Sequence, residues 1–528
     1  MAPYVADLEA DVLIVGGGPV GLTAALLLRR HGVSSIVVER RPHRTHAPKA
    51  HVLNPRSLEI LHAAGMDVDA LRAQATNPDD DKVARFVTQV QGRQLGSMPF
   101  EAQDDTYTPF PRINLAQPKL EKILRHKLAT EPEVSILEGH QWTGYEQDAD
   151  NVLSTVQTEA GVRRIRSRYL IGADGANSPV RAAAGIGMTG QQDVAPCLTI
   201  SFEANWRDML ADRPAMFYWV CGREVPGVFL AYDIGSTWTY LVLNAPATPP
   251  NADQARQIIL DAVGGPVDFT LKYVLPWGLT AQIAERYRDG RVLLAGDSAH
   301  RFPPTGGLGL NTGIQDVHNL AWKLAAVLSG RGPASLLDSY DAERRPVAQL
   351  NADQSMANAG DVIAVLTLSP EAPQDVVDQT IAKSWDAFNS LGLQLGFSYG
   401  PDPAPRTVSS FTPTGRPGDR MPHAWVGTGD RRRSALDLLD ERRYTLLAED
   451  VGPWNKAASD AGVALVGLDS VDIPRDWVEL VGITERSALL VRPDGHIAAV
   501  LSSPASADSE ALLDLLYRPL APTADPPS

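Results

Sequence analysis

Hydrophobic residues in the first part of the chain occur in short apolar runs separated by polar turns. Asp11–Val15 begins with one acid and continues with four apolar residues, which is typical of a strand in the middle of a sheet. Leu22–Leu28 is a longer, mostly apolar run that predicts a buried helix, and Ile36–Glu39 predicts a second strand. The alternation continues to about residue 185 and predicts a doubly wound α/β sheet.

The pattern changes at Pro196, where short runs rich in β-branched and aromatic residues alternate with turn residues. These runs predict an antiparallel sheet lying over the first domain. Their aromatic residues either line a pocket for a flat small molecule or form ordinary sheet core. The runs span residues 198–202, 215–220, 227–232 and 238–243.

The remainder of the chain returns to the first fold and then adds a separate unit. Val292–Ala295 is a short apolar strand, the stretch to about residue 398 is helical, and Pro401–Pro405 is a stiff linker. We therefore expect three domains, of which the first is discontinuous. They cover residues 1–185 together with 286–400, in which 330–400 is helical, an inserted sheet over 186–285, and a small C-terminal α/β domain over 406–528.

The formal net charge of −15 argues against a nucleic-acid partner, because such partners require a basic surface. The two cysteines, Cys197 and Cys221, form no cluster with histidine, so neither a disulfide scaffold nor a metal site is expected. The N-terminus lacks a signal-peptide pattern, and no apolar run approaches the roughly 18 residues of a membrane span. We expect a cytoplasmic protein without a membrane partner.

The turn between the first strand and the first helix has the spacing GxGxxG. Gly16 permits a tight turn, Gly18 lets the backbone approach a pyrophosphate, and Gly21 allows the helix to pack closely on the strand. Glu39 ends the next strand 18 residues after Gly21, where a carboxylate would bind ribose hydroxyls. This context favours a dinucleotide site over a glycine-rich turn with nothing bound.

Two later strands are also followed by acidic residues. Asp174 ends the run that begins at Tyr169, and Asp297 follows Val292–Ala295. Ligands bind at the carboxyl ends of the strands in α/β sheets, so both acids are expected near the glycine turn. A helix expected from about Leu310 points its N-terminus into the same crevice.

These three motifs, in this order, carry a specific resemblance. The chain resembles the class A FAD-dependent aromatic monooxygenases of the para-hydroxybenzoate hydroxylase fold, in the phenol and aromatic polyketide hydroxylase branch. The third motif includes the Gly-Leu-Asn run at 309–311, and the likeness covers nearly the whole chain. It implies a Rossmann-like FAD domain, an inserted antiparallel substrate-binding sheet and a thioredoxin-like C-terminal domain. Because that domain contains no cysteine, thiol chemistry is excluded there, and it is expected to contribute only surface and stability.

The resemblance also implies the cofactors and their ligands. FAD would be bound, NADPH or NADH would visit transiently, and O2 would be the co-substrate. Gln117 would contact the flavin, Asp297 the ribityl chain, and the backbone N–H groups of Leu310 and Asn311 the flavin ring. Arg181 would bind the pyrophosphate, or alternatively hold a helix end. The full set of cofactor-binding residues expected is Gly16, Gly18, Gly21, Glu39, Arg40, Lys49, Gln117, Asp174, Arg181, Asp297, Pro304, Gly307, Gly309, Leu310 and Asn311.

His51 is the expected catalytic residue, because the branch places a histidine of this segment opposite the substrate hydroxyl. The alternative is a histidine that is simply hydrogen-bonded beside the flavin. Two departures bear on this assignment. Lys49 stands where relatives have arginine, and a lysine cannot make the two-point flavin contact of an arginine. Asn114, the second expected catalytic residue, stands where relatives often have aspartate, so His51 would be a weaker base. His300 and His318 are expected to be structural.

Together these features predict hydroxylation of a phenolic or polycyclic aromatic, polyketide-derived substrate through a flavin hydroperoxide. Two alternatives stay open at this point: Baeyer–Villiger insertion or oxidative rearrangement of the same substrate class, and a flavin-binding substrate chaperone without catalysis. The substrate, the choice between NADH and NADPH, and a homodimeric state also stay open.

Overall fold

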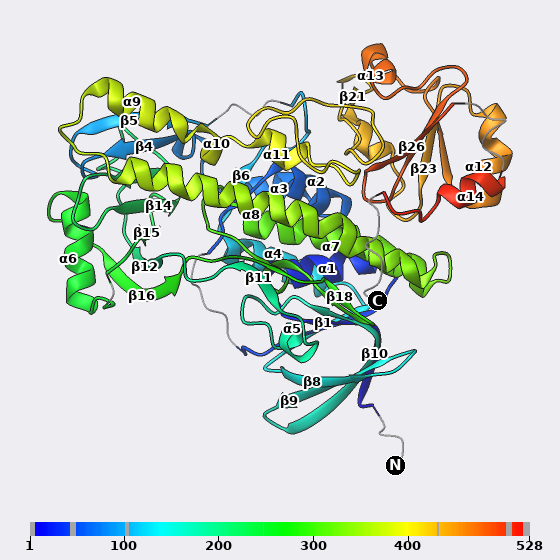
Figure 1. Ribbon diagram of the computed structural model, residues 1–528, viewed down its shortest axis with the longest axis horizontal. Coiled ribbons are helices and arrows are strands. Elements are labelled where there is room, and N and C mark those ends of the chain that lie inside the picture. The colour runs from blue at the N-terminus through cyan, green and yellow to red at the C-terminus, as the bar shows by residue number, and fades with distance from the viewer. Residues whose placement is uncertain are drawn as a thin grey trace.

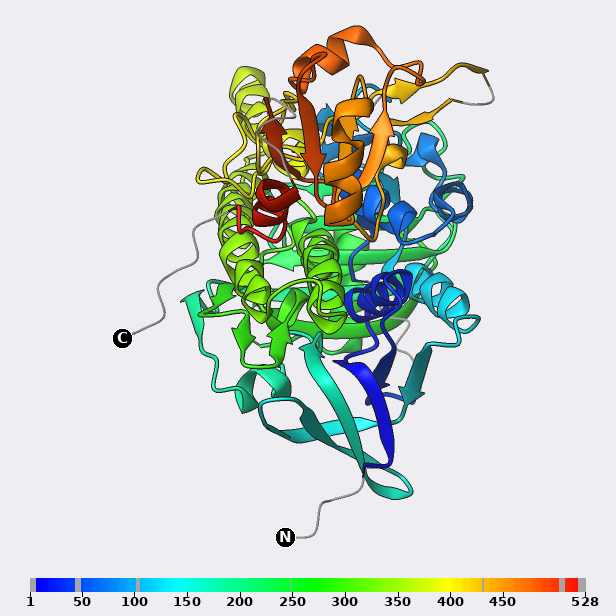
Figure 2. The same ribbon diagram turned by 90° about the vertical axis from the view of Figure 1, so that its right-hand side faces the viewer.

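The protein is described by a computed structural model that covers residues 6–42, 49–100, 105–246, 248–429, 432–502 and 509–520. Two long helices, α7 (Leu308–Leu328) and α8 (Asp338–Leu366), run through the body, and sheets lie around them (Figure 1). The C-terminal domain lies at one end, above the helices. The hairpin of β8 (Gln141–Gln147) and β9 (Val152–Thr158) lies at the opposite end (Figure 2).

The first sheet has eight strands, and its centre is parallel as the apolar runs predicted. β1 (Leu8–Val15) lies between β10 (Gly161–Gly172) and β2 (Ser35–Glu39), and β7 (Val134–Glu138) and β19 (Val292–Leu294) extend the parallel set. Val12, Leu13 and Ile14 are fully buried, in a core that the strands share with α1 (Pro19–Arg30) and α7. The carboxyl ends of these strands therefore share one edge.

The second sheet has seven strands in the order β16-β12-β15-β14-β13-β4-β5. Five of them come from the inserted segment expected over 186–285, but β4 (Val83–Val87) and β5 (Gln94–Pro99) come from the first span. β4 pairs in parallel with β13 (Phe217–Val220). A local pattern cannot show which sheet a hairpin joins, so the sheet includes strands that the expected domain boundary leaves out.

The C-terminal domain contains a four-stranded sheet in the order β24-β23-β25-β26. One parallel pair, β23 (Thr445–Ala448) with β24 (Ala464–Gly467), is combined with antiparallel β25 (Ala488–Val491) and β26 (Ile497–Leu501). Its hydrophobic core also includes Trp322 from α7. The domain is therefore packed against the FAD domain through shared apolar side chains.

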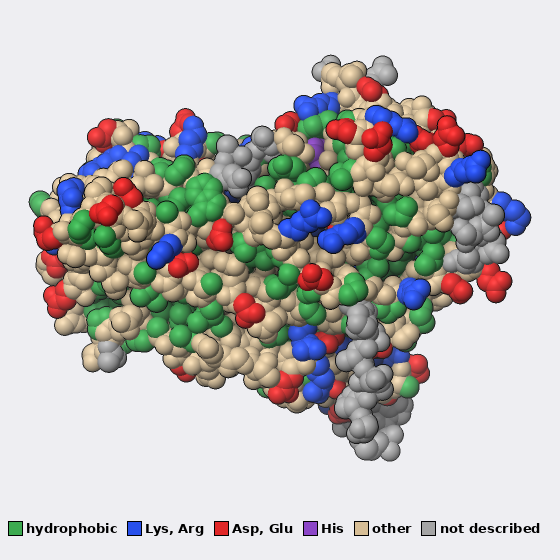
Figure 3. Space-filling view, turned by 45° about the horizontal axis from the view of Figure 1, so that its top comes forward, with side chains coloured by type: hydrophobic (Ala, Val, Ile, Leu, Met, Phe, Trp, Pro, Cys, Tyr) green, Lys and Arg blue, Asp and Glu red, His purple; other side chains and the backbone are tan. Residues whose placement is uncertain are grey.

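Shorter elements complete the described chain. Within it, no helix combines the length and apolarity that a bilayer crossing needs. On the face shown in Figure 3, basic and acidic side chains are interspersed. The other helices and strands are α1 (Pro19–Arg30), β3 (Val52–Leu53), α2 (Pro55–Ala63), α3 (Val68–Ala73), β6 (Ile113–Asn114), α4 (Gln117–Leu128), β8 (Gln141–Gln147), β9 (Val152–Thr158), α5 (Pro179–Ala183), β11 (Met188–Gln191), β12 (Pro196–Glu203), β14 (Gly227–Asp233), β15 (Thr237–Leu243), α6 (Ala252–Val263), β16 (Thr270–Gly278), β17 (Ala281–Ala284), β18 (Arg288–Asp289), β20 (His300–Arg301), α9 (Gln374–Lys383), α10 (Trp385–Phe388), α11 (Leu391–Leu395), β21 (Trp425–Val426), β22 (Arg433–Ser434), α12 (Asn455–Ala461), α13 (Arg475–Leu480) and α14 (Ser509–Leu515).

Candidate functional site

The glycines of the first turn differ in what a side chain at each position would contact. Gly16 has φ of 115°, and a Cβ there would lie 2.2 Å from the carbonyl oxygen of Ala173. A Cβ on Gly21 would lie 2.0 Å from the oxygen of Gly16. A Cβ on Gly18, in contrast, would meet no heavy atom within 4 Å. Gly16 and Gly21 are thus required by packing, and Gly18 borders open space at the N-terminus of α1, where a pyrophosphate fits.

Glu39 lies at the end of β2 and is oriented by backbone donors. Its carboxylate accepts hydrogen bonds from the N–H groups of Gly17 at 3.0 Å and Arg41 at 2.9 Å. Arg125, on α4, donates to the carbonyl oxygen of Gly17 at 2.7 Å and pairs with Glu138 at 2.9 Å. The sequence pattern did not single out Arg125, because only the packing of α4 against α1 brings it to the glycine turn. Among the other expected residues, Arg40 is exposed.

Asp174 and Arg181 connect two of the motifs. The carboxylate of Asp174 accepts from Ser178 Oγ at 2.5 Å and from the N–H of Val180 at 3.0 Å, at the start of α5. Burial raises the pKa of Asp174, although these hydrogen bonds oppose the rise. Arg181 donates to the carbonyl oxygen of Ser298 at 3.0 Å, next to Asp297. These contacts support the helix-end alternative for Arg181, and they hold the two acidic loops side by side.

The N-terminus of α7 faces the same crevice. Asp297 is exposed although the residues on either side of it are buried, so its carboxylate is available to a ligand. Gly307, with φ of 65°, precedes the first helical residue, Leu308, two positions earlier than expected. A Cβ on Gly309 would meet no heavy atom within 4 Å, and Pro304 is exposed. The N–H groups of Leu308, Gly309 and Leu310, in the first turn of α7, have no acceptor within the helix and can face a ligand.

The side chain of Asn311 holds α7 against the segment that carries His51. Its Oδ1 accepts from the N–H of Asn54 at 3.0 Å and from Ser57 Oγ at 2.7 Å. Its Nδ2 donates to the carbonyl oxygens of Val52 at 3.0 Å and Gly307 at 2.7 Å. The amide is therefore satisfied on both sides. The side chain is thus not available to the flavin ring, and the contact that the resemblance implies would have to come from the backbone N–H of Asn311.

His51 lies at the start of the two-stranded ladder in which Val52 pairs with Asn114. Its Nδ1 lies 3.0 Å from Oδ1 of Asn114, whose Nδ2 donates to the carbonyl oxygen of Ala231 at 3.3 Å. A carbonyl can only accept, so the amide must present its oxygen to His51. His51 therefore carries its proton on Nδ1, and its Nε2 lone pair is left to accept a hydrogen bond. The structure thus brings the two expected catalytic residues together.

Burial controls the protonation of His51. It lowers the pKa of His51 to about 4, against the opposing effect of the Asn114 hydrogen bond, and the nearby Arg112 lowers it further. The imidazole is consequently neutral near pH 7 and can accept a proton or a hydrogen bond. Without a carboxylate partner it is a weak base.

Aromatic side chains surround His51 on the side of the seven-stranded sheet. The rings of Tyr232 and Phe217 lie edge-on to His51, with centroid distances of 5.0 and 5.7 Å. Phe100 and Phe388 each lie about 6 Å from Phe217. The sequence singled out the sheet aromatics as a group, but not Phe100 or Phe388, which come from distant parts of the chain.

Lys49 and Gln117 lie on the approach to this site. Lys49 is exposed, and its carbonyl oxygen accepts from the Tyr232 hydroxyl at 2.7 Å. The N–H of Gln117 donates to the carbonyl oxygen of Ala50 at 2.9 Å. Both residues therefore flank the backbone just before His51, on the side expected to face the flavin.

The other two histidines of the glycine-aspartate region are held away from substrate chemistry. His300 Nε2 lies 2.7 Å from Asp316, which also binds the N–H of Gly296. Burial lowers the pKa of His318 well below its ordinary value, so it is neutral. In the described part of the chain, no group of three or more metal-ligating side chains occurs.

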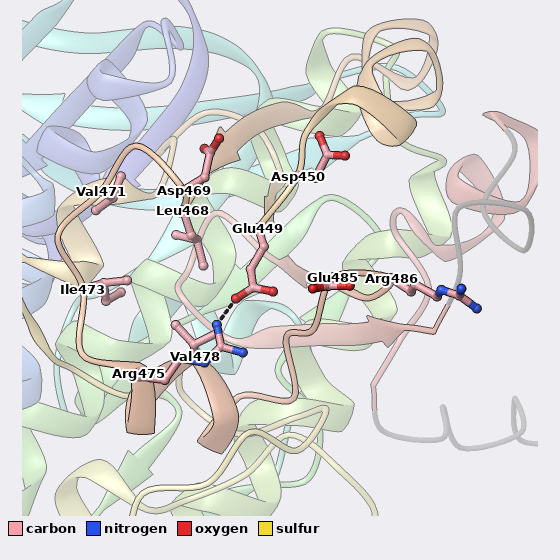
Figure 4. A pocket seen from close by; sticks show the side chains of 10 residues that line it. All are labelled: Glu449, Asp450, Leu468, Asp469, Val471, Ile473, Arg475, Val478, Glu485 and Arg486. Carbon is pink, nitrogen blue, oxygen red and sulfur yellow. Dashed lines mark hydrogen bonds and ion pairs between the residues drawn. The ribbon is translucent and has the colours of Figure 1, made fainter.

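A separate hollow lies on the C-terminal domain, at the carboxyl ends of β23 and β24 (Figure 4). It has an apolar floor that includes Leu468 and Val478, and its rim carries Glu449, which pairs with Arg475. The hollow shares no residue with the glycine turns or with His51. We therefore assign it no part in flavin or substrate binding.

Buried histidines predict how the stability of the protein depends on pH. The pKa values of His51 and His496 are lowered to about 4, in both cases chiefly by burial. Between pH 6.5 and 4 the unfolded chain binds more protons at these positions, so stability is complete above about pH 6.5 and falls below it. For each of these histidines, we expect the free energy of unfolding to fall by about 1.4 kcal/mol for every pH unit below 6.5 in this window.

Urea unfolding at pH 7 and pH 5 measures this loss. His496→Gln should reduce the pH dependence, whereas His126→Gln, at an exposed position, should leave it unchanged. Equal free energies of unfolding at the two pH values would contradict the prediction.

Comparisons with known proteins agree with this geometry. The FAD binding domain family matches residues 9–355, and the aromatic-ring hydroxylase C-terminal family matches 414–522. The 4-methyl-5-nitrocatechol 5-monooxygenase of Burkholderia sp is 33% identical over 97% of this chain and 98% of its own. Aklavinone 12-hydroxylase RdmE of Streptomyces purpurascens is 34% identical over 97% of this chain and 99% of its own. The flavin-dependent monooxygenase PieE, solved with FAD and substrate, superimposes with a TM-score of 0.87 at 32% identity, over 98% of this chain and 100% of that one.

The residues present fit FAD. Open space lies at Gly18, backbone N–H groups orient the Glu39 carboxylate, and an exposed Asp297 faces the free N-terminus of α7. The match extends over both halves of the chain, including the C-terminal domain. The chain therefore belongs to the FAD-dependent aromatic-ring monooxygenases.

Proposed function

We propose that this monooxygenase hydroxylates a phenolic or polycyclic aromatic, polyketide-derived compound, with NADH or NADPH as the reductant. The observation that carries the proposal is the buried His51, which presents a free Nε2 lone pair among aromatic rings. Edge-on rings of Tyr232 and Phe217 suit a flat substrate, and the lone pair suits its hydroxyl group. The cytoplasm, where NADH and NADPH are available, is the proposed compartment.

The chain holds FAD with groups from four segments. Gly18 and the N-terminus of α1 would take the pyrophosphate, Glu39 the ribose and Asp297 the ribityl chain. The free N–H groups at the start of α7 would face the flavin ring, where negative charge develops on reduction. When bound, reduced FAD activates O2 and supplies the oxygen atom that enters the substrate ring.

His51 acts on the substrate hydroxyl. Moving a proton from a simple phenol, with a pKa near 10, to an imidazole with a pKa of about 4 would cost on the order of 8 kcal/mol. The same proton transfer from a hydroxyl that is already acidic, as in a hydroxyquinone or a nitrophenol, costs far less free energy. The weak base in this site therefore favours a substrate with an acidic hydroxyl, which His51 orients by accepting its hydrogen bond.

The similar proteins support the same class of substrate. One carries the name of an aklavinone hydroxylase, and another that of a nitrocatechol monooxygenase. The second name denotes a catechol, a hydroxylated aromatic ring, that carries a nitro group. This name supports a substrate in which conjugation makes the ring hydroxyl acidic.

Asn114 is expected to act through His51 by fixing its tautomer. Asn114→Leu removes the acceptor for Nδ1–H, so the proton can move to Nε2 and block the acceptor that the substrate needs. We expect the hydroxylation rate to fall about tenfold, the effect of roughly 1.4 kcal/mol or one hydrogen bond. Single-turnover rates with the FAD-loaded protein measure it. Ser154→Ala, which removes the buried acceptor of the Trp142 ring N–H on β9, is a control away from the site. An unchanged rate would show that Asn114 does not orient His51.

Incubation with NADPH or NADH, 18O2 and a panel of phenols and hydroxyquinones tests the proposed reaction. Hydroxylation adds one labelled oxygen to a substrate whose ring skeleton is intact. A labelled lactone or a rearranged skeleton would instead indicate Baeyer–Villiger insertion or oxidative rearrangement. If no compound in the panel stimulates NAD(P)H oxidation while several of them bind, the protein is a flavin-binding chaperone and the proposal is wrong.

A further inference from the structure

Helices α2 and α7 both begin at the candidate active site and continue to the C-terminal domain. α2 begins at Pro55, just after the short strand that follows His51, and α7 begins beside Asp297. Their first residues are joined through Asn311, which binds both Asn54 and Ser57. Contacts made by later residues of the two helices therefore determine how His51 and the N–H groups of α7 face each other.

The C-terminal domain holds α2 through buried charged groups. Arg420 donates two hydrogen bonds to the carboxylate of Glu59, from Nε at 2.8 Å and from Nη2 at 2.5 Å. Arg56 donates to the same carboxylate at 3.1 Å and to the carbonyl oxygen of Asp494 at 2.7 Å. Burial alone would raise the pKa of Glu59, but Arg420 and Arg56 outweigh it and hold the pKa below its ordinary value. Glu59 is thus a buried anion.

The same domain holds α7 in a second place. Arg492 makes two contacts with Glu343 of α8, at 2.7 and 2.9 Å, and Lys323 of α7 reaches the same carboxylate at 2.8 Å. Trp322 Nε1 donates to Asp494 at 3.2 Å. No charged side chain in either group is more than 5% exposed.

Both contacts lie within reach of the site along a rigid helix. Glu59 is four residues after Pro55, roughly 6 Å along α2, and Lys323 is 15 residues after Leu308, roughly 22 Å along α7. Buried ion pairs add little net stability compared with apolar packing, but each permits only a narrow geometry. A domain that only covered apolar surface would not need them.

We propose that the C-terminal domain positions the active site, because Arg420 and Arg492 fix α2 and α7 so that His51 and the N-terminal amides of α7 keep their separation. Arg420 and Arg492 are positioning residues, since they act through the helices and touch neither FAD nor substrate. The inference goes beyond the expectation that this domain contributes only surface and stability, and it rests on the role proposed for His51.

Arg420→Gln in the full-length protein tests the inference. Glu59 keeps Arg56 and Thr108 as partners, so the variant is expected to fold. We expect the Kd for FAD to rise about tenfold and the single-turnover hydroxylation rate to fall about tenfold. Arg420→Lys keeps the charge but loses the two-point contact, so it should recover only part of the FAD affinity and part of the hydroxylation rate. Should Arg420→Gln not fold, Arg420→Lys carries the test by itself.

Arg443→Gln is the matched control. Arg443 also donates from Nε and Nη2 to one carboxylate, in this case to Oδ2 of Asp440, but the pair lies wholly within the C-terminal domain. Its substitution should change neither the FAD Kd nor the rate. If Arg420→Gln lowers the thermal midpoint while the FAD Kd and the rate stay as in the unaltered protein, Arg420 is only structural and the inference is wrong.

A double variant separates this inference from the proposed function. If Arg420 acts through His51, Arg420→Gln should reduce the rate less in a His51→Ala background than in the unaltered protein. Equal fold-reductions in both backgrounds would overturn the link to His51. If His51→Ala alone has no effect, the proposed role of His51 fails, and the FAD Kd of Arg420→Gln still decides whether the domain positions the cofactor side.

Discussion

His51→Ala is expected to lower the rate of hydroxylation by about 10^2-fold to 10^4-fold, the range typical of a general acid–base group, while FAD remains bound. The imidazole is the polar side chain that the structure places among the aromatic rings, and its Nε2 can accept the substrate hydroxyl. Because the pKa of His51 is about 4, the effect should be smallest for the most acidic substrates. Single-turnover rates across substrates of graded acidity measure both features.

The same variant provides its own control for the cofactor side. The side chain of His51 contacts Asn114 and aromatic rings, so FAD absorbance and Kd should stay within about twofold of the unaltered protein. His300→Ala is unsuitable as a comparison because it would leave the buried Asp316 with one partner fewer. An unchanged rate and pH profile in His51→Ala would show that this histidine is structural.

Gly18→Val is expected to abolish FAD binding without unfolding the protein. A Cβ at this position meets no protein atom within 4 Å, so the side chain is tolerated by the fold but occupies the space left for the pyrophosphate. We expect the Kd for FAD to rise by at least about 10^2-fold, or roughly 3 kcal/mol. Asp297→Ala should likewise give protein without flavin, because it removes the carboxylate expected to hold the ribityl chain.

Two glycine variants control this experiment. Gly144→Val lies on β8, where a Cβ also meets nothing within 4 Å, and it should bind FAD normally. Gly21→Val places a side chain against the backbone of Gly16 and should impair folding itself. The proposed cofactor site is wrong if Gly18→Val, refolded with excess FAD, shows the same flavin absorbance shift and fluorescence quenching as the unaltered protein.

Sequence and structure agree best where the contacts that fix an element join residues close to each other in the chain. Gly16 and Gly21 lie within one strand–helix unit, and each has the packing role that its spacing predicted. Glu39 ends the next strand as expected, and its contact with a ribose stays a prediction. His51 and Asn114 are 63 residues apart, yet the resemblance paired them, and the structure joins them at 3.0 Å. Their roles with substrate and flavin stay predictions until the variants above are measured.

The sequence by itself determined the parallel sheet, the glycine turn at its carboxyl edge and the family, since apolar runs and glycine spacing reflect contacts between neighbours in the chain. Only the tertiary structure decided that β4 and β5 join the seven-stranded sheet, that Phe388 approaches Phe217, and that Arg420 reaches Glu59. Glu59 and Arg420 are 361 positions apart, and each alone looks like an ordinary surface charge. Such pairs have no local pattern, because the packing of whole domains brings them together.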